Sequence, residues 1–99
     1  MKSFGDMMKQ AQKMQKQMGE LQEKLAEERY EGSSGGGLVK AVVDGKQMLK
    51  EFKLSPKVLD EKDVTLLEDL VITAIGEAQR TSQEKMAEAY SKVTGGFNL

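Results

Sequence analysis

Apolar residues recur at helical spacing near the start of the chain. They are separated alternately by four and three residues, at Met7, Ala11, Met14, Met18, Leu21 and Leu25. This spacing is typical of the apolar seam of an amphipathic helix. Ser3 and Asp6 have the spacing of a capping signal at the first turn. The pattern predicts a helix over about residues 5–28, in which Gly19 costs about 1 kcal/mol relative to alanine.

Residues rich in β-branched and aromatic side chains follow, and they predict a sheet over residues 29–54. A short strand is expected at residues 29–31, before the glycine-rich run 32–37 breaks the pattern. A second strand is expected at residues 38–43, and a return strand at residues 47–54.

Asp44-Gly45 stands between the last two strand-like runs. This dipeptide indicates a tight hairpin in which both central residues have positive φ. Along the return strand, alternation places Met48, Phe52 and Leu54 on one face, although Leu49 interrupts it. The sheet is therefore expected to be antiparallel.

A second long helix is predicted over residues 63–93, after Ser55-Pro56 begins a short turn that runs through Leu59. Its apolar stripe comprises Leu67, Val71, Ala74, Ala78, Met86, Ala89 and Val93, widened by Leu66, Leu70 and Ile75. The stripe fades near Thr81 and Ser82. Gly95-Gly96 is expected to end the helix, with a loose tail after it.

The predicted order is helix, three strands, helix, which is an α+β fold in one domain over residues 1–99. The two helices would be roughly 35 and 45 Å long, whereas a compact domain of this size has a radius of gyration of about 13 Å. A small sheet cannot cover such helices from end to end. We therefore expect a homodimer with projecting helical arms, in which Met7, Met14, Met18, Leu21 and Leu25 form core or dimer contacts.

Composition argues against an enzyme. The chain has no His and no Cys, so the usual nucleophile–base pairs are missing. Its acidic clusters lack the spacing of a calcium loop, and neither a metal nor a cofactor nor a small-molecule substrate is expected. No run of 18 apolar residues and no signal peptide are visible, which favours a cytoplasmic protein without a membrane partner.

The glycine-rich run leads into a strand rather than into Gly-Lys-Ser/Thr and a helix, so a strand connection is favoured over a phosphate-binding loop. The methionines of the first helix are ambiguous. Methionine adapts to varied partners, so the seam suits either helix packing or a promiscuous binding surface.

Charge is polarised along the first helix. Residues 1–18 carry four lysines and one acidic residue, a net charge of +3, whereas residues 19–31 carry a net charge of −3. Lys9, Lys13 and Lys16 are expected on the face opposite the apolar seam, where they suit either a solvated surface or contact with DNA phosphates. The second helix offers Arg80, Lys85 and Lys92 among interleaved glutamates, an arrangement typical of a salt-bridged solvent surface, and Arg80 and Lys85 are kept as further candidates. The net charge of the chain, −1, speaks mildly against nucleic acid.

Three segments together resemble the YbaB/EbfC family of bacterial nucleoid-associated proteins. They are the methionine-, lysine- and glutamine-rich helix over residues 7–15, the run from Gly32 through Leu38-Val39-Lys40-Ala41 to Asp44-Gly45, and Leu66-Leu67-Glu68-Asp69-Leu70-Val71 continuing through Ala74, Glu77 and Ala78. The chain ends in Gly95-Gly96-Phe97-Asn98-Leu99 where members of this family often carry a Pro-Gly-Leu/Phe tail.

The resemblance implies an α-β-β-β-α homodimer with a shared sheet, located in the nucleoid, whose arms grip duplex DNA and thereby affect chromosome organisation and gene expression. The lysine pattern adds Lys9, Lys13, Lys16, Arg80 and Lys85 as candidate DNA contacts. A holdase-type chaperone or a protein adaptor that uses the methionine-rich seam is the alternative.

Overall fold

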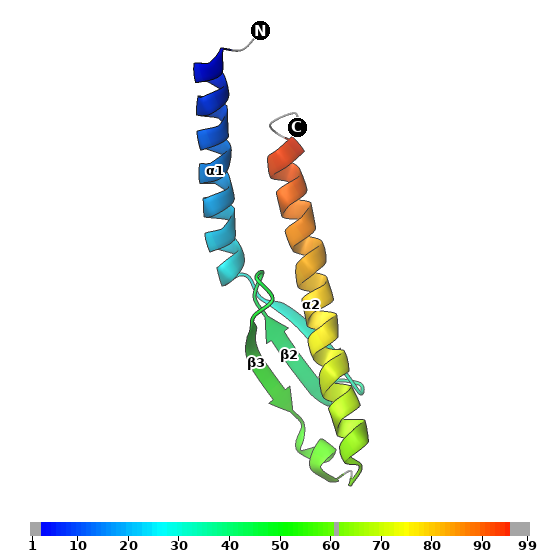
Figure 1. Cartoon of the computed structure of the whole chain (residues 1–99). Coiled ribbons are helices and arrows are strands. Elements are labelled where there is room, and N and C mark those ends of the chain that lie inside the picture. The colour runs from blue at the N-terminus through cyan, green and yellow to red at the C-terminus, as the bar shows by residue number, and fades with distance from the viewer. Residues whose placement is uncertain (1–2, 61, 96–99) are drawn as a thin grey trace.

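A computed structural model describes residues 3–60 and 62–95. It contains α1 (Phe4–Glu27), β1 (Tyr30–Ser34), β2 (Val39–Val43), β3 (Leu49–Leu54), the short 3-10 helix η1 (Pro56–Asp60) and α2 (Val64–Gly95). The strands form one antiparallel sheet in the order β1-β2-β3. The predicted α-β-β-β-α order is confirmed (Figure 1).

Both long helices begin at caps that the sequence supplies. The Ser3 hydroxyl accepts a hydrogen bond from the backbone N–H of Asp6 at 3.2 Å, and the Asp63 carboxylate accepts one from Leu66 N–H at 3.1 Å. These bonds satisfy N–H groups that have no partner inside the helix. The 24 residues of α1 and the 32 residues of α2 lie within two residues of the predicted ranges.

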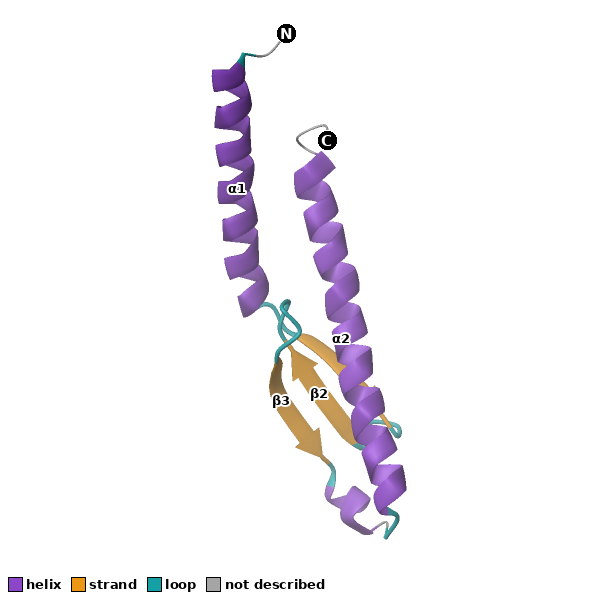
Figure 2. Ribbon diagram, viewed as in Figure 1, coloured by secondary structure: helices purple, strands orange, loops and turns teal. Residues whose placement is uncertain are grey.

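The core lies between one face of the sheet and α2 (Figure 2). α2 packs across β1 and β2, and the fully buried side chains include Val39, Ala41 and Val43 of β2 with Ala74 and Ala78 of α2. Val58 of η1 closes one end of this cluster. The core is small and aliphatic, as expected for a chain with five aromatic residues in a hundred.

The first strand is longer than predicted, because Gly32, Ser33 and Ser34 belong to β1 instead of to a break. Contact with α2 is the reason. A Cβ on Gly32 would lie 2.3 Å from the Ala74 carbonyl oxygen, so glycine allows the helix backbone to rest directly on the strand. The Ser34 hydroxyl donates a hydrogen bond to the Leu70 carbonyl at 2.5 Å. The turn is confined to the residues after Ser34, where Gly35, Gly36 and Gly37 have positive φ.

The prediction of a tight hairpin at Asp44-Gly45 is wrong. Residues 44–48 form a longer connection, positive φ occurs at Gln47 (70°) rather than at Asp44 or Gly45, and β3 begins at Leu49 instead of Gln47. A register shift between Val42 and Val43 accompanies this longer connection. Gly45 is buried against the end of α1. Glycine is required there because a side chain would collide with Leu25, and not because of a positive φ.

The apolar stripe of α2 does not fade where predicted. Ser82 is fully buried, and its hydroxyl donates to the Asp44 carbonyl at 2.8 Å, so it continues the stripe as a polar member with a satisfied hydrogen bond. α2 runs through Gly95, the last described residue, so Gly95 does not end the helix, and Gly96 lies outside the described residues. The predicted loose tail lies outside the described residues.

Candidate nucleic-acid interface

Two helical segments extend beyond the sheet, side by side and antiparallel (Figure 1). We call residues 4–24 the α1 arm and residues 83–95 the α2 arm. Among the described residues, α1 has one fully buried side chain, Leu25 at its base, and those of α2 end at Ser82. The arms give the molecule its length, with principal extents of 68 × 18 × 16 Å.

The seam of α1 is covered unevenly. Leu25 is 4% exposed, and Met14, Met18 and Leu21 are half-buried, whereas Met7 is 59% exposed. Ala11 is also exposed, as are Phe4 and Met8 beside the seam. The seam therefore acts as core at its base and remains uncovered toward its tip within this chain.

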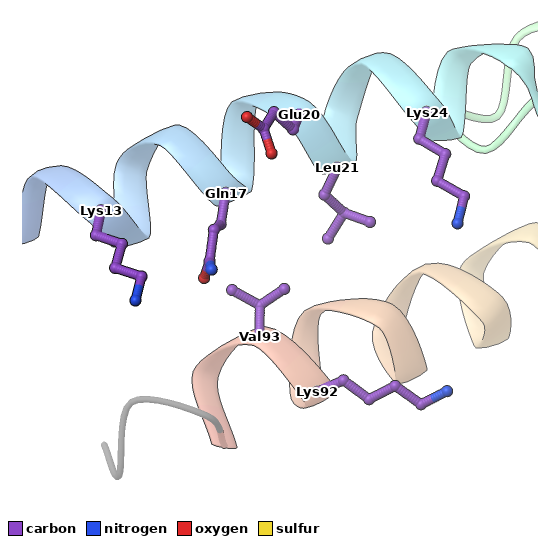
Figure 3. Close-up of a pocket in the computed structure, with 7 residues that line it drawn as sticks. All are labelled: Lys13, Gln17, Glu20, Leu21, Lys24, Lys92 and Val93. Carbon is purple, nitrogen blue, oxygen red and sulfur yellow. The ribbon is translucent and has the colours of Figure 1, made fainter. Parts of the chain in front are cut away.

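The three candidate lysines of α1 are all exposed, but they do not share one surface. Lys9 and Lys16 lie two turns apart, about 10 Å along the helix axis. Lys13 was expected on the face opposite the seam, and this placement is wrong. Its side chain points toward α2 and lines the groove between the arms (Figure 3). Lys13 lines the groove because α2 lies to one side of the apolar seam of α1 rather than directly against it.

The groove between the arms has an apolar floor and charged walls. Its outer part has a volume of about 530 Å³ and is lined by Lys13, Gln17, Glu20, Leu21, Lys24, Lys92 and Val93. Figure 3 shows Gln17 and Leu21 of α1 directed toward Val93 of α2. The inner part continues to the sheet and is lined by Leu21, Lys24, Leu25, Glu28, Tyr30, Lys85, Glu88, Ala89 and Lys92. Burial, and then the Glu28 carboxylate, raise the pKa of Tyr30, so its hydroxyl stays protonated.

Arg80 and Lys85 do not come together. Five residues on a helix correspond to a rotation of about 140°, so Lys85 faces the groove while Arg80 lies on the outer side of α2. Lys85 forms an ion pair with Glu88, with Nζ and Oε2 3.8 Å apart, on an exposed surface where such a pair contributes little.

Two further lysines of the groove were not among the predicted site residues. Lys24 follows Lys13 by eleven residues and Lys92 follows Lys85 by seven, so each pair repeats on one face of its helix. That periodicity was visible in the sequence, but the sequence did not show which faces of the two helices lie opposite each other. The structure thus gathers Lys13, Lys24, Lys85 and Lys92 around the groove and leaves Lys9 and Lys16 outside it.

The edge of the sheet offers a second exposed surface. β3 pairs with β2 on one side and, in the described part of the chain, with no strand on the other. Phe52 and Leu54 lie opposite the buried Ala41 and Val39, so they share the face that α2 covers over β1 and β2. They remain 39% and 41% exposed because α2 does not extend over β3.

Neither a metal-binding cluster nor a membrane span stands out in residues 3–60 and 62–95. No three acidic, His or Cys side chains there are grouped to hold an ion. No helix in those ranges has the length and hydropathy needed to cross a bilayer.

Residues 1–97 match the model of the YbaB/EbfC DNA-binding family. The chain is 44% identical over 97 residues to the nucleoid-associated protein TTE0040 of Caldanaerobacter subterraneus subsp. tengcongensis, covering 98% of this chain and 87% of that protein. It is also 44% identical over 99 residues to the nucleoid-associated protein amb4104 of Paramagnetospirillum magneticum, covering 100% and 92%. The fold is similar to that of the uncharacterized protein HP0035 from Helicobacter pylori, with a TM-score of 0.85, 18% identity and coverage of 95% and 99%.

Proposed function

Because the chain belongs to the YbaB/EbfC DNA-binding family, we propose that it is a homodimeric nucleoid-associated protein that binds duplex DNA through its basic helical arms. Binding of this kind would affect chromosome organisation and gene expression. The observation that carries the proposal is the α1 arm, which projects beyond the sheet with Lys9, Lys13 and Lys16 exposed and no acidic residue between Asp6 and Glu20.

A lysine row on a projecting helix suits the phosphate backbone. Each ammonium that contacts a phosphate releases a condensed counterion, and this release favours binding at low salt. The ammonium groups of Lys9 and Lys16 are free to follow one strand, while Lys13 faces the adjacent groove. The whole chain carries a net charge of −1, so attraction depends on this local surface, and we expect modest affinity that falls steeply with salt.

Dimerisation through the β3 edge would place two copies of the lysine surface on one particle. An unpaired edge strand with exposed apolar side chains is a ready template for pairing with another chain. Pairing of β3 with its two-fold mate would extend the sheet to six strands and place Phe52 and Leu54 beside apolar side chains of the partner strand, which would shield part of their surface. An isologous contact of this kind is the commonest form of soluble dimer.

The chaperone or adaptor hypothesis is favoured by one observation, the exposed apolar tip of the α1 arm. Phe4 is 77% exposed, Met7 59% and Met8 46%. A methionine-rich surface of this kind can accommodate varied apolar partners. It becomes the preferred function if the protein does not bind DNA.

The test is fluorescence anisotropy of a labelled duplex of about 30 base pairs, titrated with the wild type at several salt concentrations. The variant Lys9→Gln/Lys13→Gln/Lys16→Gln removes the α1 lysines. Lys53→Gln/Lys57→Gln/Lys62→Gln removes three exposed lysines elsewhere and is the charge-matched control. Each phosphate contact that is lost should make the log–log salt slope shallower by about 0.9, which is about 1.8 for an arm that uses Lys9 and Lys16 and about 2.7 for an arm that also uses Lys13.

The proposal requires weak binding by the α1 variant and wild-type binding by the control. If both variants weaken binding equally, net charge rather than the arm is responsible. If the wild type does not bind at low salt, DNA binding is rejected for this protein.

A further inference from the structure

The connection between β2 and β3, residues 44–48, contacts both arms at their bases. From α1, the Leu25 carbonyl accepts a hydrogen bond from Gly45 N–H at 2.7 Å. From α2, the Ser82 hydroxyl donates to the Asp44 carbonyl at 2.8 Å. The connection therefore links the last turn of one arm's helix to the point where the other helix leaves the sheet (Figure 1).

The contact with α1 requires glycine at position 45, because there is no space for a side chain. A Cβ on Gly45 would lie 2.5 Å from the Leu25 carbonyl oxygen and 2.7 Å from Leu25 Cβ, both below any normal contact distance. The Leu25 carbonyl, in the last turn of α1, accepts a hydrogen bond from the C-cap Glu28 N–H at 3.2 Å, and the Gly45 N–H adds a second one from the connection. The base of α1 is thus held against the connection by backbone atoms, whose positions vary little.

The contact with α2 spans one turn of that helix. Besides Ser82, the Gln83 amide donates to Gln47 Oε1 at 2.9 Å, and the Gln79 amide lies 3.5 Å from the Gln47 carbonyl. Gln47, which has a left-handed backbone conformation with φ at 70°, offers both its carbonyl oxygen and Oε1 to this turn of α2.

The connection is itself held in shape by the Asp44 carboxylate. Oδ1 accepts hydrogen bonds from Lys46 N–H at 2.7 Å and from Met48 N–H at 3.0 Å, and Oδ2 lies 3.7 Å from Lys50 Nζ. With 2% of Asp44 exposed, these bonds are sheltered from water. A connection fixed internally and bound at both sides is able to set an angle between the two helices it contacts.

We infer that residues 44–48, the arm clamp, position the α1 arm relative to the α2 arm and so set the spacing of the surfaces offered to DNA. The inference rests on the proposed DNA-binding function. Lys9 lies sixteen residues from Leu25, roughly 24 Å along α1, so a tilt of about 10° at the clamp would move it by about 4 Å. Residues 4–13 of α1 are exposed apart from Gln10, so contacts nearer the base of the helix set the direction of its tip.

The experiment measures the distance between the arms directly. The chain has no cysteine, so Gln12→Cys and Ser91→Cys introduce one spin label on an exposed position of each arm. Distances are measured by pulsed electron resonance, after dilution with unlabelled protein. DNA affinity is measured on the same proteins by anisotropy, below the onset of thermal unfolding.

Gly45→Ala introduces the collision with Leu25, and Ser82→Ala removes the one buried bond of the α2 contact while leaving those of Gln79 and Gln83. Gly76→Ala is the control, because Gly76 is exposed on α2 with no atom within 4 Å of an added Cβ. We expect Gly45→Ala to shift or broaden the distance distribution by about 3 Å, because the label at Gln12 lies thirteen residues from Leu25. We also expect DNA affinity to weaken about tenfold, as if one or two phosphate contacts were lost. Gly76→Ala should leave both measurements unchanged.

A folded Gly45→Ala protein with the wild-type distance distribution would overturn the inference. If Gly45→Ala does not fold, Ser82→Ala decides, and a wild-type distribution there has the same consequence. A changed distance with unchanged affinity would overturn the link to DNA. Failure of the wild type to bind DNA would reject the proposed function, while the distances would still show whether the clamp positions the arms.

Discussion

At the scale of the residue, Asp44 is the acidic side chain that the fold buries and uses. Burial alone would raise the pKa of its carboxyl. The N–H groups of Met48 and Lys46, together with the charges of Lys50 and Arg29, outweigh burial and hold that pKa below its ordinary value. Each of these favourable interactions is stronger with the ionised carboxylate than with the neutral acid, so Asp44 stabilises the fold most in its charged form.

We predict that the stabilisation by Asp44 is lost in acid. Since its pKa is lowered by folding, its contribution is fully present above the unfolded value of about 3.9 and disappears as pH falls through the folded value. Asp44→Asn should be less stable than the wild type near neutral pH, and the difference should shrink below about pH 4. Urea unfolding across this pH range measures it. A constant difference at all pH values would show that the amide, rather than the lost charge, causes the effect.

At the scale of the element, α1 depends more on its own helical propensity than α2 does. It is rich in Gln, Lys, Glu and Met, all good helix formers, and its burial is concentrated at Leu25. Gly19 lies in the exposed middle of the arm, and an added Cβ there would meet no atom within 4 Å. The helix continues through it, so Gly19 weakens the arm without serving a contact.

We predict that Gly19→Ala stabilises the arm by about 0.5–1 kcal/mol. If the arm unfolds together with the sheet, the midpoint of thermal unfolding should rise by about 2–8 °C for a domain of this size. Circular dichroism follows the transition. Gly76→Ala, in the part of α2 that packs on the sheet, is the matched comparison. A rise for Gly76→Ala alone would mean that the α1 arm melts before the rest of the domain.

At the scale of the whole molecule, the chain is extended. Its radius of gyration is 19.5 Å, compared with about 13 Å for a compact domain of this length. Much apolar surface stays exposed, both along α1 and at the β3 edge, where Phe52 and Leu54 belong to the core face of the sheet without a helix above them. A single chain of this shape buries little apolar surface for its size, which favours association with another chain.

We predict that Phe52→Glu/Leu54→Glu converts a dimer into a monomer. Two carboxylates on the paired apolar surface would have to be desolvated and would face their own copies across the two-fold axis, at a cost of several kcal/mol. Sedimentation velocity should then give a mass near 11.0 kDa rather than twice that value. Lys53→Glu, on the opposite face of the same strand, is the control and should stay dimeric. A dimer that survives the double substitution must use another surface.

The sequence by itself determined the order of the elements, the helix caps, the two apolar stripes and the positions of the lysines. These features depend on interactions within a few residues, so local spacing records them. The DNA-binding role of Lys9, Lys13, Lys16, Arg80 and Lys85, and the homodimer, remain predictions. The helical spacing of Lys13 and Lys24 was also visible in the sequence, but the sequence did not show that both lysines face α2.

Only the tertiary structure decided which segments touch. It placed Lys13 and Lys85 in the groove, buried Ser82 and put Gly45 against Leu25. Asp44-Gly45 resembled a local turn signal, yet its use is a contact between backbone segments twenty residues apart. Such close approach depends on how α1, the sheet and α2 pack together. The spacing of residues along one helix or strand does not show which other element packs against it.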